Sequence, residues 1–262
     1  MDFRKAILQD LAAMKALYAD TIRSVCRKDY NEEQVRVWSS SVNKEERWLD
    51  VVTNQFVLLA EIDGVLVGFG TLRNYDYIDF FYVHKDFQGQ GIARALLSRL
   101  LQEATGQGED LVTSDISITA RPFFEKNGFK VVAEQENIRQ GLILVNYKMV
   151  RYLPGPGPGP ELKAVFNITR SFKVEGPALM LTGHLIDGEV SSHQHIEFVA
   201  ENQFRLRRIT GVQVLKESKP DHPGRGLLIR CESEEELEEL CNWQPFNEVA
   251  IVYQADLIPR NE

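Results

Sequence analysis

A run of alternating proline and glycine near the middle of the chain constrains its fold more than any other feature. Residues 154–160 read Pro-Gly-Pro-Gly-Pro-Gly-Pro and are the only low-complexity segment among the 262 residues. Proline fixes φ and lacks a backbone N–H, while glycine adds freedom, so neither helix nor sheet continues through this segment. We interpret it as a spacer, either a natural linker or an engineered junction. The sequence therefore predicts a first domain at 1–152, a linker at 153–160 and a second domain at 161–262.

The composition is that of an ordinary globular protein, with 44% hydrophobic and 26% charged residues. No apolar run approaches the ~20 residues that a transmembrane helix needs, and residues 1–7 lack the apolar core of a signal peptide. The three cysteines, Cys26, Cys231 and Cys241, cannot all pair and show no metal-binding spacing. We therefore expect a cytoplasmic protein with no membrane partner and no bound metal.

Charge is distributed unevenly between the two predicted domains. Residues 1–152 hold 19 basic and 21 acidic side chains, and residues 161–262 hold 11 and 17, a difference of six. This excess of acid argues against a broad nucleic-acid surface, which needs clustered Lys and Arg. A local basic patch at Arg205, Arg207 and Arg208 stays open, and Glu232–Glu239 predicts an exposed acidic helix.

A glycine-containing turn lies between a predicted strand and a predicted helix. Gln88-Gly89-Gln90-Gly91-Ile92-Ala93 follows the apolar run 78–83 and opens a helical pattern over 91–104. Glycines allow close approach of a ligand to backbone N–H groups, and a helix N-terminus favours negative charge. The pattern predicts a site for phosphate or pyrophosphate. It is neither a P-loop nor a dinucleotide fingerprint, so spacing alone leaves a plain solvent-exposed connection as the alternative.

Three segments, in order, resemble the GNAT N-acetyltransferase superfamily: Asp63–Gly70, Phe80–Leu97 and Ser117–Phe129. The family pattern Gln/Arg-x-x-Gly-x-Gly/Ala is matched at Gln88, Gly91 and Ala93. The resemblance covers roughly residues 1–150. It implies an α/β (α+β) GNAT acyltransferase fold with a mixed, splayed sheet, and acetyl-CoA as cosubstrate.

Hydrophobic periodicity places the elements of both domains. In the first domain we expect strands at 3–8, 56–62, 65–73, 77–83, 111–116, 129–136 and 142–150, helices at 10–24, 91–104 and 119–127, and a helical region over about 31–51. In the second we expect short strands at 164–168, 178–185, 197–199, 203–209, 211–215, 226–229 and 247–253, and a helix at 233–241. That spacing predicts an all-β barrel or sandwich.

The second domain also resembles the β-barrel that forms domain two of translation factors of the elongation factor Tu type. The similar segments are Val165–Phe172, Leu181–Leu185 and Gly188–Val190. The GTPase domain that accompanies such barrels is absent from this sequence, and an unrelated small barrel is the alternative. The resemblance implies a possible macromolecular partner bound through the barrel.

The GNAT resemblance implies a set of residues that bind acetyl-CoA. Main-chain groups around the glycine turn would hold the pyrophosphate, those of two residues in the preceding strand would pair with the pantetheine arm, and a serine stands where many relatives have Asn. These residues are Gln88, Gly89, Gln90, Gly91, Ile92 and Ala93 for the pyrophosphate, Phe81 and Val83 for the arm, and Ser117. Plain core packing is the alternative role for Phe81 and Val83.

Direct transfer of the acetyl group requires a neutral amine, and a carboxylate can remove its proton. Asp79, on the strand that splays in this family, is the first candidate base, and Asp115 is the second. The family commonly protonates the leaving thiolate with a Tyr, but this chain has Phe124 there. Tyr147 is the candidate acid on a nearby strand. For all three, an ordinary hydrogen-bonded or half-buried side chain is the alternative.

The acceptor is not identified by the sequence. Tyr30, Trp38, Trp48, Tyr75 and Tyr77 lie in segments that line acceptor sites in the family, where an aromatic wall would receive a small-molecule or peptide amine; core packing is the alternative. Acidic residues in the same segments would attract a cationic amine or form a solvated face: Glu32, Glu33, Asp76 and Asp79.

Two classes of function follow. The first is an acetyl-CoA-dependent N-acetyltransferase acting on a primary amine, with an appended barrel for binding or acceptor presentation. The second is a non-catalytic acyl-CoA-binding sensor or interaction protein, which Phe124 keeps open. A histidine cluster, His184, His193 and His195, would need a further ligand to bind a metal. The oligomeric state is not predicted.

Overall fold

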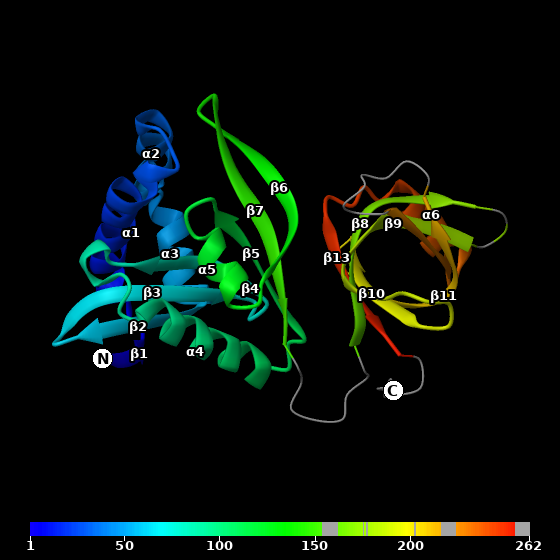
Figure 1. Cartoon of the computed structure of the whole chain (residues 1–262), viewed down its shortest axis with the longest axis horizontal. Coiled ribbons are helices and arrows are strands. Elements are labelled where there is room, and N and C mark those ends of the chain that lie inside the picture. The colour runs from blue at the N-terminus through cyan, green and yellow to red at the C-terminus, as the bar shows by residue number, and fades with distance from the viewer. Residues whose placement is uncertain (154–161, 175, 177, 202, 216–223, 255–262) are drawn as a thin grey trace. The chain divides into compact units, whose positions relative to one another are not determined.

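The computed structural model describes residues 1–153, 162–174, 176, 178–201, 203–215 and 224–254, with only the backbone at Phe204. The chain divides into two compact units, Met1–Gly155 and Pro156–Glu262. Of the predicted linker at 153–160, all but Leu153 lies outside the described residues. Each unit is considered by itself (Figure 1).

The first unit is a seven-stranded mixed sheet in the order β1-β2-β3-β4-β5-β7-β6, with helices on both faces (Figure 1). The strands are β1 (Asp2–Lys5), β2 (Phe56–Ile62), β3 (Val65–Arg73), β4 (Tyr77–Val83), β5 (Leu111–Ser117), β6 (Lys130–Arg139) and β7 (Leu142–Tyr152). The helices are α1 (Leu11–Val25), α2 (Glu32–Ser39), α3 (Glu45–Asn54), α4 (Ile92–Gly106) and α5 (Arg121–Lys126), and short 3-10 turns join several of them. Only β4 and β5 are parallel neighbours.

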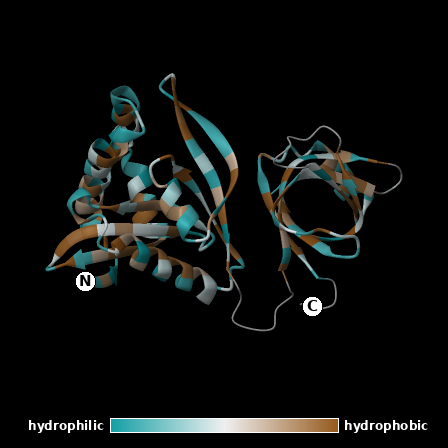
Figure 2. Ribbon diagram, in the orientation of Figure 1, coloured by the Kyte–Doolittle hydropathy of each residue, from teal (hydrophilic) through white to brown (hydrophobic). Residues whose placement is uncertain are grey.

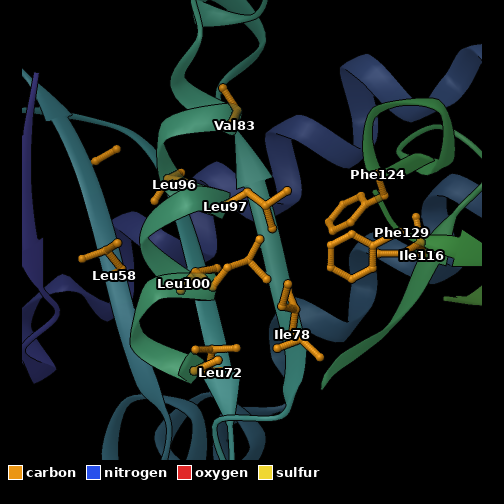
Figure 3. Packing of buried hydrophobic residues seen from close by; sticks show 14 of the residues in the cluster. Leu58, Leu72, Ile78, Val83, Leu96, Leu97, Leu100, Ile116, Phe124 and Phe129 are labelled. Carbon is orange, nitrogen blue, oxygen red and sulfur yellow. The ribbon is translucent and has the colours of Figure 1, made fainter. Parts of the chain in front are cut away.

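Alternation of side chains gives this sheet two hydrophobic cores. In β2, Leu58 packs in the core beneath α4, whereas its neighbour Leu59 packs in the core beneath α1 and α3. Figure 2 shows that β2 and β3 carry hydrophobic residues along much of their length. Figure 3 shows Leu96, Leu97 and Leu100 of α4 against these strands. Burial on both faces explains why these strands read as nearly continuous apolar runs.

Two glycines of β3 let α4 lie close to the sheet. A Cβ added at Gly70 would lie 2.7 Å from Leu100 Cδ1, and one at Gly68 would lie 3.0 Å from Leu96 Cδ1. Larger side chains there would push the helix away, because core packing leaves no room for extra methyl groups.

Strands β4 and β5 separate soon after they begin. Their parallel pairing is confined to Tyr77 with Thr113 and Ile78 with Ser114. Pairing between β3 and β4 is irregular beside Thr71, whose buried Oγ1 accepts a hydrogen bond from the Phe80 N–H at 3.0 Å. Such bulges bend a strand and increase its twist. The bulge therefore turns β4 away from β5 and opens the sheet at its centre.

The second unit is a closed antiparallel barrel in the order β10-β11-β12-β9-β8-β13. Its strands are β8 (Leu162–Lys173), β9 (Ala178–Gly188), β10 (His195–Ala200), β11 (Gln203–Val214), β12 (Gly224–Arg230) and β13 (Glu248–Tyr253). Helix α6 (Glu234–Asn242) contributes Leu237 and Leu240 to the barrel core. Trp243, just after α6, stacks on Phe198 of β10 with ring centroids 5.6 Å apart.

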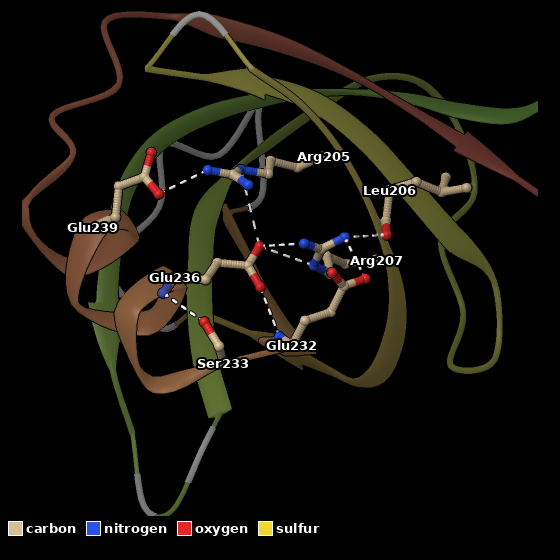
Figure 4. A network of polar contacts seen from close by, with 7 residues as sticks. All are labelled: Arg205, Leu206, Arg207, Glu232, Ser233, Glu236 and Glu239. Carbon is tan, nitrogen blue, oxygen red and sulfur yellow. Dashed lines mark hydrogen bonds and ion pairs between the residues drawn. The ribbon is translucent and has the colours of Figure 1, made fainter.

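A buried ion-pair network joins α6 to strand β11 (Figure 4). Glu236, 6% exposed, pairs with Arg207, which is 8% exposed, and Arg207 also pairs with Glu232 at 3.1 Å. Arg205 pairs with Glu239 at 2.7 Å. The expectation of an exposed acidic helix was therefore wrong at Glu236. Two of the three arginines of the predicted basic patch, Arg205 and Arg207, form ion pairs with glutamates of α6. They lie two residues apart in β11, so their side chains are on the same face of the strand.

The predicted fold class is confirmed, and three predicted strands, 56–62, 65–73 and 77–83, coincide with β2, β3 and β4. The predicted helical region at about 31–51 corresponds to α2 and α3, which the 3-10 helix η3 (Ser40–Asn43) separates. The predicted strands at 203–209 and 211–215 are one strand, β11. A register shift between Ile209 and Gly211 interrupts the alternation there and imitates a strand end.

Candidate active site

A cavity of about 600 Å³ occupies the opening between the separated strands. Eight of the nine predicted acetyl-CoA residues line it: Phe81, Val83, Gln88, Gly89, Gly91, Ile92, Ala93 and Ser117. The ninth, Gln90, is not in the wall, and its side-chain amide donates to the Asp86 carbonyl at 3.4 Å. The strand, the glycine turn and the helix start are thus brought to one cavity.

The glycine turn is open on the side where side chains would project. Gly89 and Gly91 have φ values of +75° and +82°, and no heavy atom lies within 4 Å of a Cβ built on either. Gly91 is the N-cap of α4, so the first N–H groups of the helix, at Ile92 and the residues after it, have no intrahelical acceptor. No acidic side chain occupies the first turn of α4. The geometry suits a phosphate or pyrophosphate.

The opposite side of this cavity is aromatic. Phe81 of β4 stacks on Phe123 of α5, with ring centroids 5.7 Å apart. Phe124 is 1% exposed and meets Phe81 and Phe129 edge-on at 5.3 and 5.0 Å. At the position of the usual family Tyr, this chain therefore has a core side chain with no proton to transfer.

A second cavity, of about 660 Å³, lies on the other side of the separated strands. Five residues line both cavities: Trp38, Asp79, Tyr82, Asp115 and Ser117. The two cavities therefore lie next to each other at the opening between β4 and β5.

The two candidate bases lie at this junction in different surroundings. Both oxygens of Asp79 accept hydrogen bonds at 2.8 Å, one from Arg47 and one from the Gln55 amide. Asp115 accepts from the Tyr77 hydroxyl at 3.1 Å through Oδ2. Burial raises the pKa of Tyr77, and the nearby negative charges of Asp115 and Asp79 add to the rise, so this phenol stays protonated and donates.

Two other predicted site residues have structural partners. Tyr147 lines neither cavity; it packs against the core beneath α4, and the Arg121 guanidinium lies 4.3 Å from its ring centroid. Ser117 lies at the junction, but its Oγ accepts from the Ala120 N–H at 3.1 Å, in the turn that leads into α5.

The predicted aromatic wall is brought together only in part. Tyr30, Trp38 and Tyr77 line the second cavity, Trp48 is a core residue at 1% exposure, and Tyr75 lines neither cavity. Of the predicted acidic set, Asp79 alone lines either cavity.

Two tyrosines that the sequence analysis missed line the second cavity. Tyr82 and Tyr18 lie edge to face at 4.8 Å, and the Tyr18 hydroxyl lies 2.5 Å from Ser41 Oγ. Alternation along β4 places Phe80 and Tyr82 on one face and could have indicated Tyr82. No local pattern distinguishes Tyr18 from its core neighbours in α1.

Across the described ranges, no group of three or more His, Cys, Asp or Glu side chains is arranged to hold a metal ion. His193 precedes strand β10 and has a φ of +77°, so it does not alternate with His195 as a strand pair would. Within the same residues, no helix is long and apolar enough to cross a membrane.

Comparison with known proteins identifies the family. The family described as "Acetyltransferase (GNAT) domain" matches residues 26–151. An uncharacterized N-acetyltransferase of Escherichia coli K12, YafP, is 32% identical over 145 residues, which cover 55% of this chain and 91% of that protein. The chain belongs to the GNAT acetyltransferase family, and it is an N-acetyltransferase.

Two further similarities agree with this assignment. A GCN5-related N-acetyltransferase structure from Rhodopseudomonas palustris is 31% identical, with a TM-score of 0.56, and covers 58% of this chain and 95% of its own. The L-amino acid N-acyltransferase MnaT of E. coli K12 is 31% identical over 93 residues, covering 31% of this chain and 54% of that protein. All three matched proteins are similar to part of the chain.

Proposed function

We propose that this enzyme transfers the acetyl group of acetyl-CoA directly to a primary amine in the opening between β4 and β5. The observation that carries the proposal is the meeting of two cavities at one set of residues. The first cavity ends on the anion-binding start of α4, as acetyl-CoA requires. The second cavity has its own lining beyond the shared residues, which gives the acceptor a space separate from that of acetyl-CoA.

The reaction is balanced within this opening. The neutral amine attacks the thioester carbonyl, a C–N bond forms, the C–S bond breaks, and CoA leaves as a thiolate. The amine loses one proton and the thiolate gains one. Backbone N–H groups of β4 that β5 no longer covers are suited to stabilise the developing oxyanion.

Proton removal is proposed to involve the junction carboxylates. Both oxygens of Asp79 accept hydrogen bonds, one of them from the Arg47 cation, whereas the hydrogen bond that Tyr77 donates goes to Oδ2 of Asp115. We therefore propose that Asp115 is the base, acting directly or through water. Asp79 is proposed to position Arg47. The role of Tyr147 as the proton donor to the thiolate stays a prediction. Its ring lies against the Arg121 guanidinium, and solvent is the alternative proton donor.

The barrel is proposed to bind a partner or to present the acceptor. Its support is a closed barrel with its own core and buried ion-pair network, which makes it a separate folded module. The likeness to domain two of translation factors stays a prediction.

The cofactor site is tested by isothermal titration of acetyl-CoA into wild type and Gly91→Glu. We expect the variant to weaken binding at least about tenfold, or about 1.4 kcal/mol, because the new carboxylate points where the pyrophosphate would lie. Gly64→Glu is the matched control, since Gly64 also has a positive φ and open space but lies in the β2–β3 hairpin. Equal affinities in all three proteins would contradict the site.

The sensor alternative is tested by release of CoA thiol across a panel of amines. Acetyl-CoA binding without any thiol release would favour a non-catalytic acyl-CoA-binding protein, the function that Phe124 keeps open. Release that depends on both acetyl-CoA and an amine supports the transferase.

A further inference from the structure

The second cavity is lined by more cationic than acidic side chains, whereas the first unit as a whole has a slight excess of acidic ones. Its charged side chains are four cations and two acids: Lys44, Arg47, Arg73, Arg139, Asp79 and Asp115. Residues 1–152 carry 19 basic and 21 acidic side chains, so the unit is slightly acidic. Cations are therefore concentrated at this cavity.

The two acids in the lining do not neutralise these cations. Asp79 pairs with Arg47 at 2.8 Å, and Asp115 is hydrogen-bonded to Tyr77. In the part of the chain that the structure describes, Lys44, Arg73 and Arg139 form no ion pair. Arg73 instead lies over the Tyr77 ring, 4.4 Å from its centroid.

The arginines come from different elements and surround the same space. Arg47 belongs to α3, Arg73 ends β3, and Arg139 ends β6. Burial raises the pKa of Tyr18, while its hydrogen bond to Ser41 and then the positive charges of Arg139 and Arg47 oppose that rise. Arg139 and Arg47, from separate elements, thus act on one phenol in the cavity wall.

We propose that the acceptor is an amine that also carries a carboxylate, of the amino-acid class. Arg139 and Arg73 bind the carboxylate, and the amine extends to the junction beside Asp115. A guanidinium presents paired N–H donors that match a carboxylate, and such charge-assisted hydrogen bonds are strong. The inference rests on the proposed acetyl transfer and adds the identity of the group that positions the acceptor.

The same charges disfavour two other acceptor types. A polycation would be repelled by three cations that have no acidic partner. An amine without a carboxylate would form no ion pair with the guanidinium groups, which would stay hydrated. Its binding would therefore gain no affinity from them. The predicted attraction of a cationic amine by acidic side chains is thus limited to the residues that both cavities share, where Asp79 and Asp115 lie.

The test compares amino acids with their own amides, from glycine to phenylalanine, as acceptors for the full-length enzyme. The amide keeps the side chain but loses the charge, and its amine is less basic, so amine reactivity alone would favour the amide. We expect kcat/KM for the best amino acid to exceed that of its amide by about tenfold or more. Equal or faster acetylation of the amides would overturn the proposal while leaving acetyl transfer intact.

Variants locate the carboxylate site. Arg139→Gln and Arg73→Gln are each expected to raise KM for the amino acid about tenfold and to leave KM for the amide unchanged. Lys126→Gln, an exposed cation on α5 outside both cavities, is the matched control and should change neither. Unchanged acetyl-CoA affinity shows that each variant is folded. Retained preference for the acid in both arginine variants would overturn the assignment.

Direct binding separates failure of this inference from failure of the proposed function. If no acceptor is acetylated, amino acids and amides are titrated against the enzyme with CoA present, and tryptophan fluorescence reports on Trp38 in the cavity wall. Saturable binding of the acids alone, lost in Arg139→Gln, would support the carboxylate site without turnover. No binding of the acids would overturn it.

Discussion

At the scale of single residues, surroundings separate side chains that look alike in the sequence. Asp79 and Asp115 are both acids on strands at the centre of the sheet, and both line the junction of the two cavities. Arg47 and Gln55 donate hydrogen bonds to Asp79, whereas the neutral Tyr77 hydroxyl donates to Asp115. An ionised carboxylate can accept about four hydrogen bonds, so the ranking of the two candidates rests on the ion pair that Asp79 already forms with Arg47.

The two acids should therefore differ in mutational effect. We expect Asp115→Asn to lower kcat about 100-fold with unchanged acetyl-CoA affinity, the usual scale for loss of a general base. Asp79→Asn should act mainly through Arg47 and lower kcat less. Steady-state kinetics of both variants, with Tyr77→Phe as a control for the Asp115 hydrogen bond, make the comparison. A larger loss of kcat in Asp79→Asn would restore Asp79 as the base.

At the scale of elements, glycine sets how closely strands and helices approach. In the first unit, Gly68 and Gly70 allow α4 to lie against β3. In the barrel, Gly183 of β9 lies beside an irregularity in its pairing with β8, and a Cβ there would lie 1.7 Å from the Asn167 carbonyl oxygen. The obstacle is backbone and cannot rotate away.

Gly183→Ala should therefore destabilise the barrel by about 3 kcal/mol or more. Gly211→Ala is the matched control, because its Cβ would meet Leu228 Cβ at an ordinary 3.5 Å. We expect the control to stay within about 1 kcal/mol of wild type. Calorimetric unfolding of both proteins measures the difference. Similar midpoints for the two variants would contradict the close approach at Gly183.

At the scale of the whole molecule, all proposed chemistry lies in one unit. Both cavities are lined entirely by residues between Tyr18 and Asn146, and the first unit has two hydrophobic cores of its own. The barrel has a separate core that α6 completes. Neither core needs residues from the other unit.

A chain ending at Leu153 should thus fold and bind acetyl-CoA with an affinity within twofold of the full protein. Acetylation of small acceptors should persist at a similar kcat/KM, and titration with kinetics on the two chains tests both statements. A macromolecular acceptor that only the full chain acetylates would assign presentation to the barrel. Equal activity on every acceptor would contradict that role.

Local patterns in the sequence were sufficient for much of the fold. Strands β2, β3 and β4 were predicted with their observed bounds, because their apolar runs lie between clear turns. The glycine turn predicted where α4 begins, since positive φ and a helix N-terminus are local properties of the backbone, and anion binding there stays a prediction. The division of the chain at the Pro-Gly run stays a prediction, because residues 154–160 lie outside the described residues.

Only the tertiary structure decided which side chains meet. Arg47 and Asp79 are 32 residues apart in sequence, and Arg207 and Glu236 are 29 apart, yet each pair is in contact. Arg73 and Arg139 likewise come to one cavity from different strands. Periodicity records which face of an element is apolar, but charge pairing depends on which elements pack together. The sequence by itself therefore determined most of the elements and the glycine turn that begins α4, and tertiary packing determined which charged side chains line the second cavity.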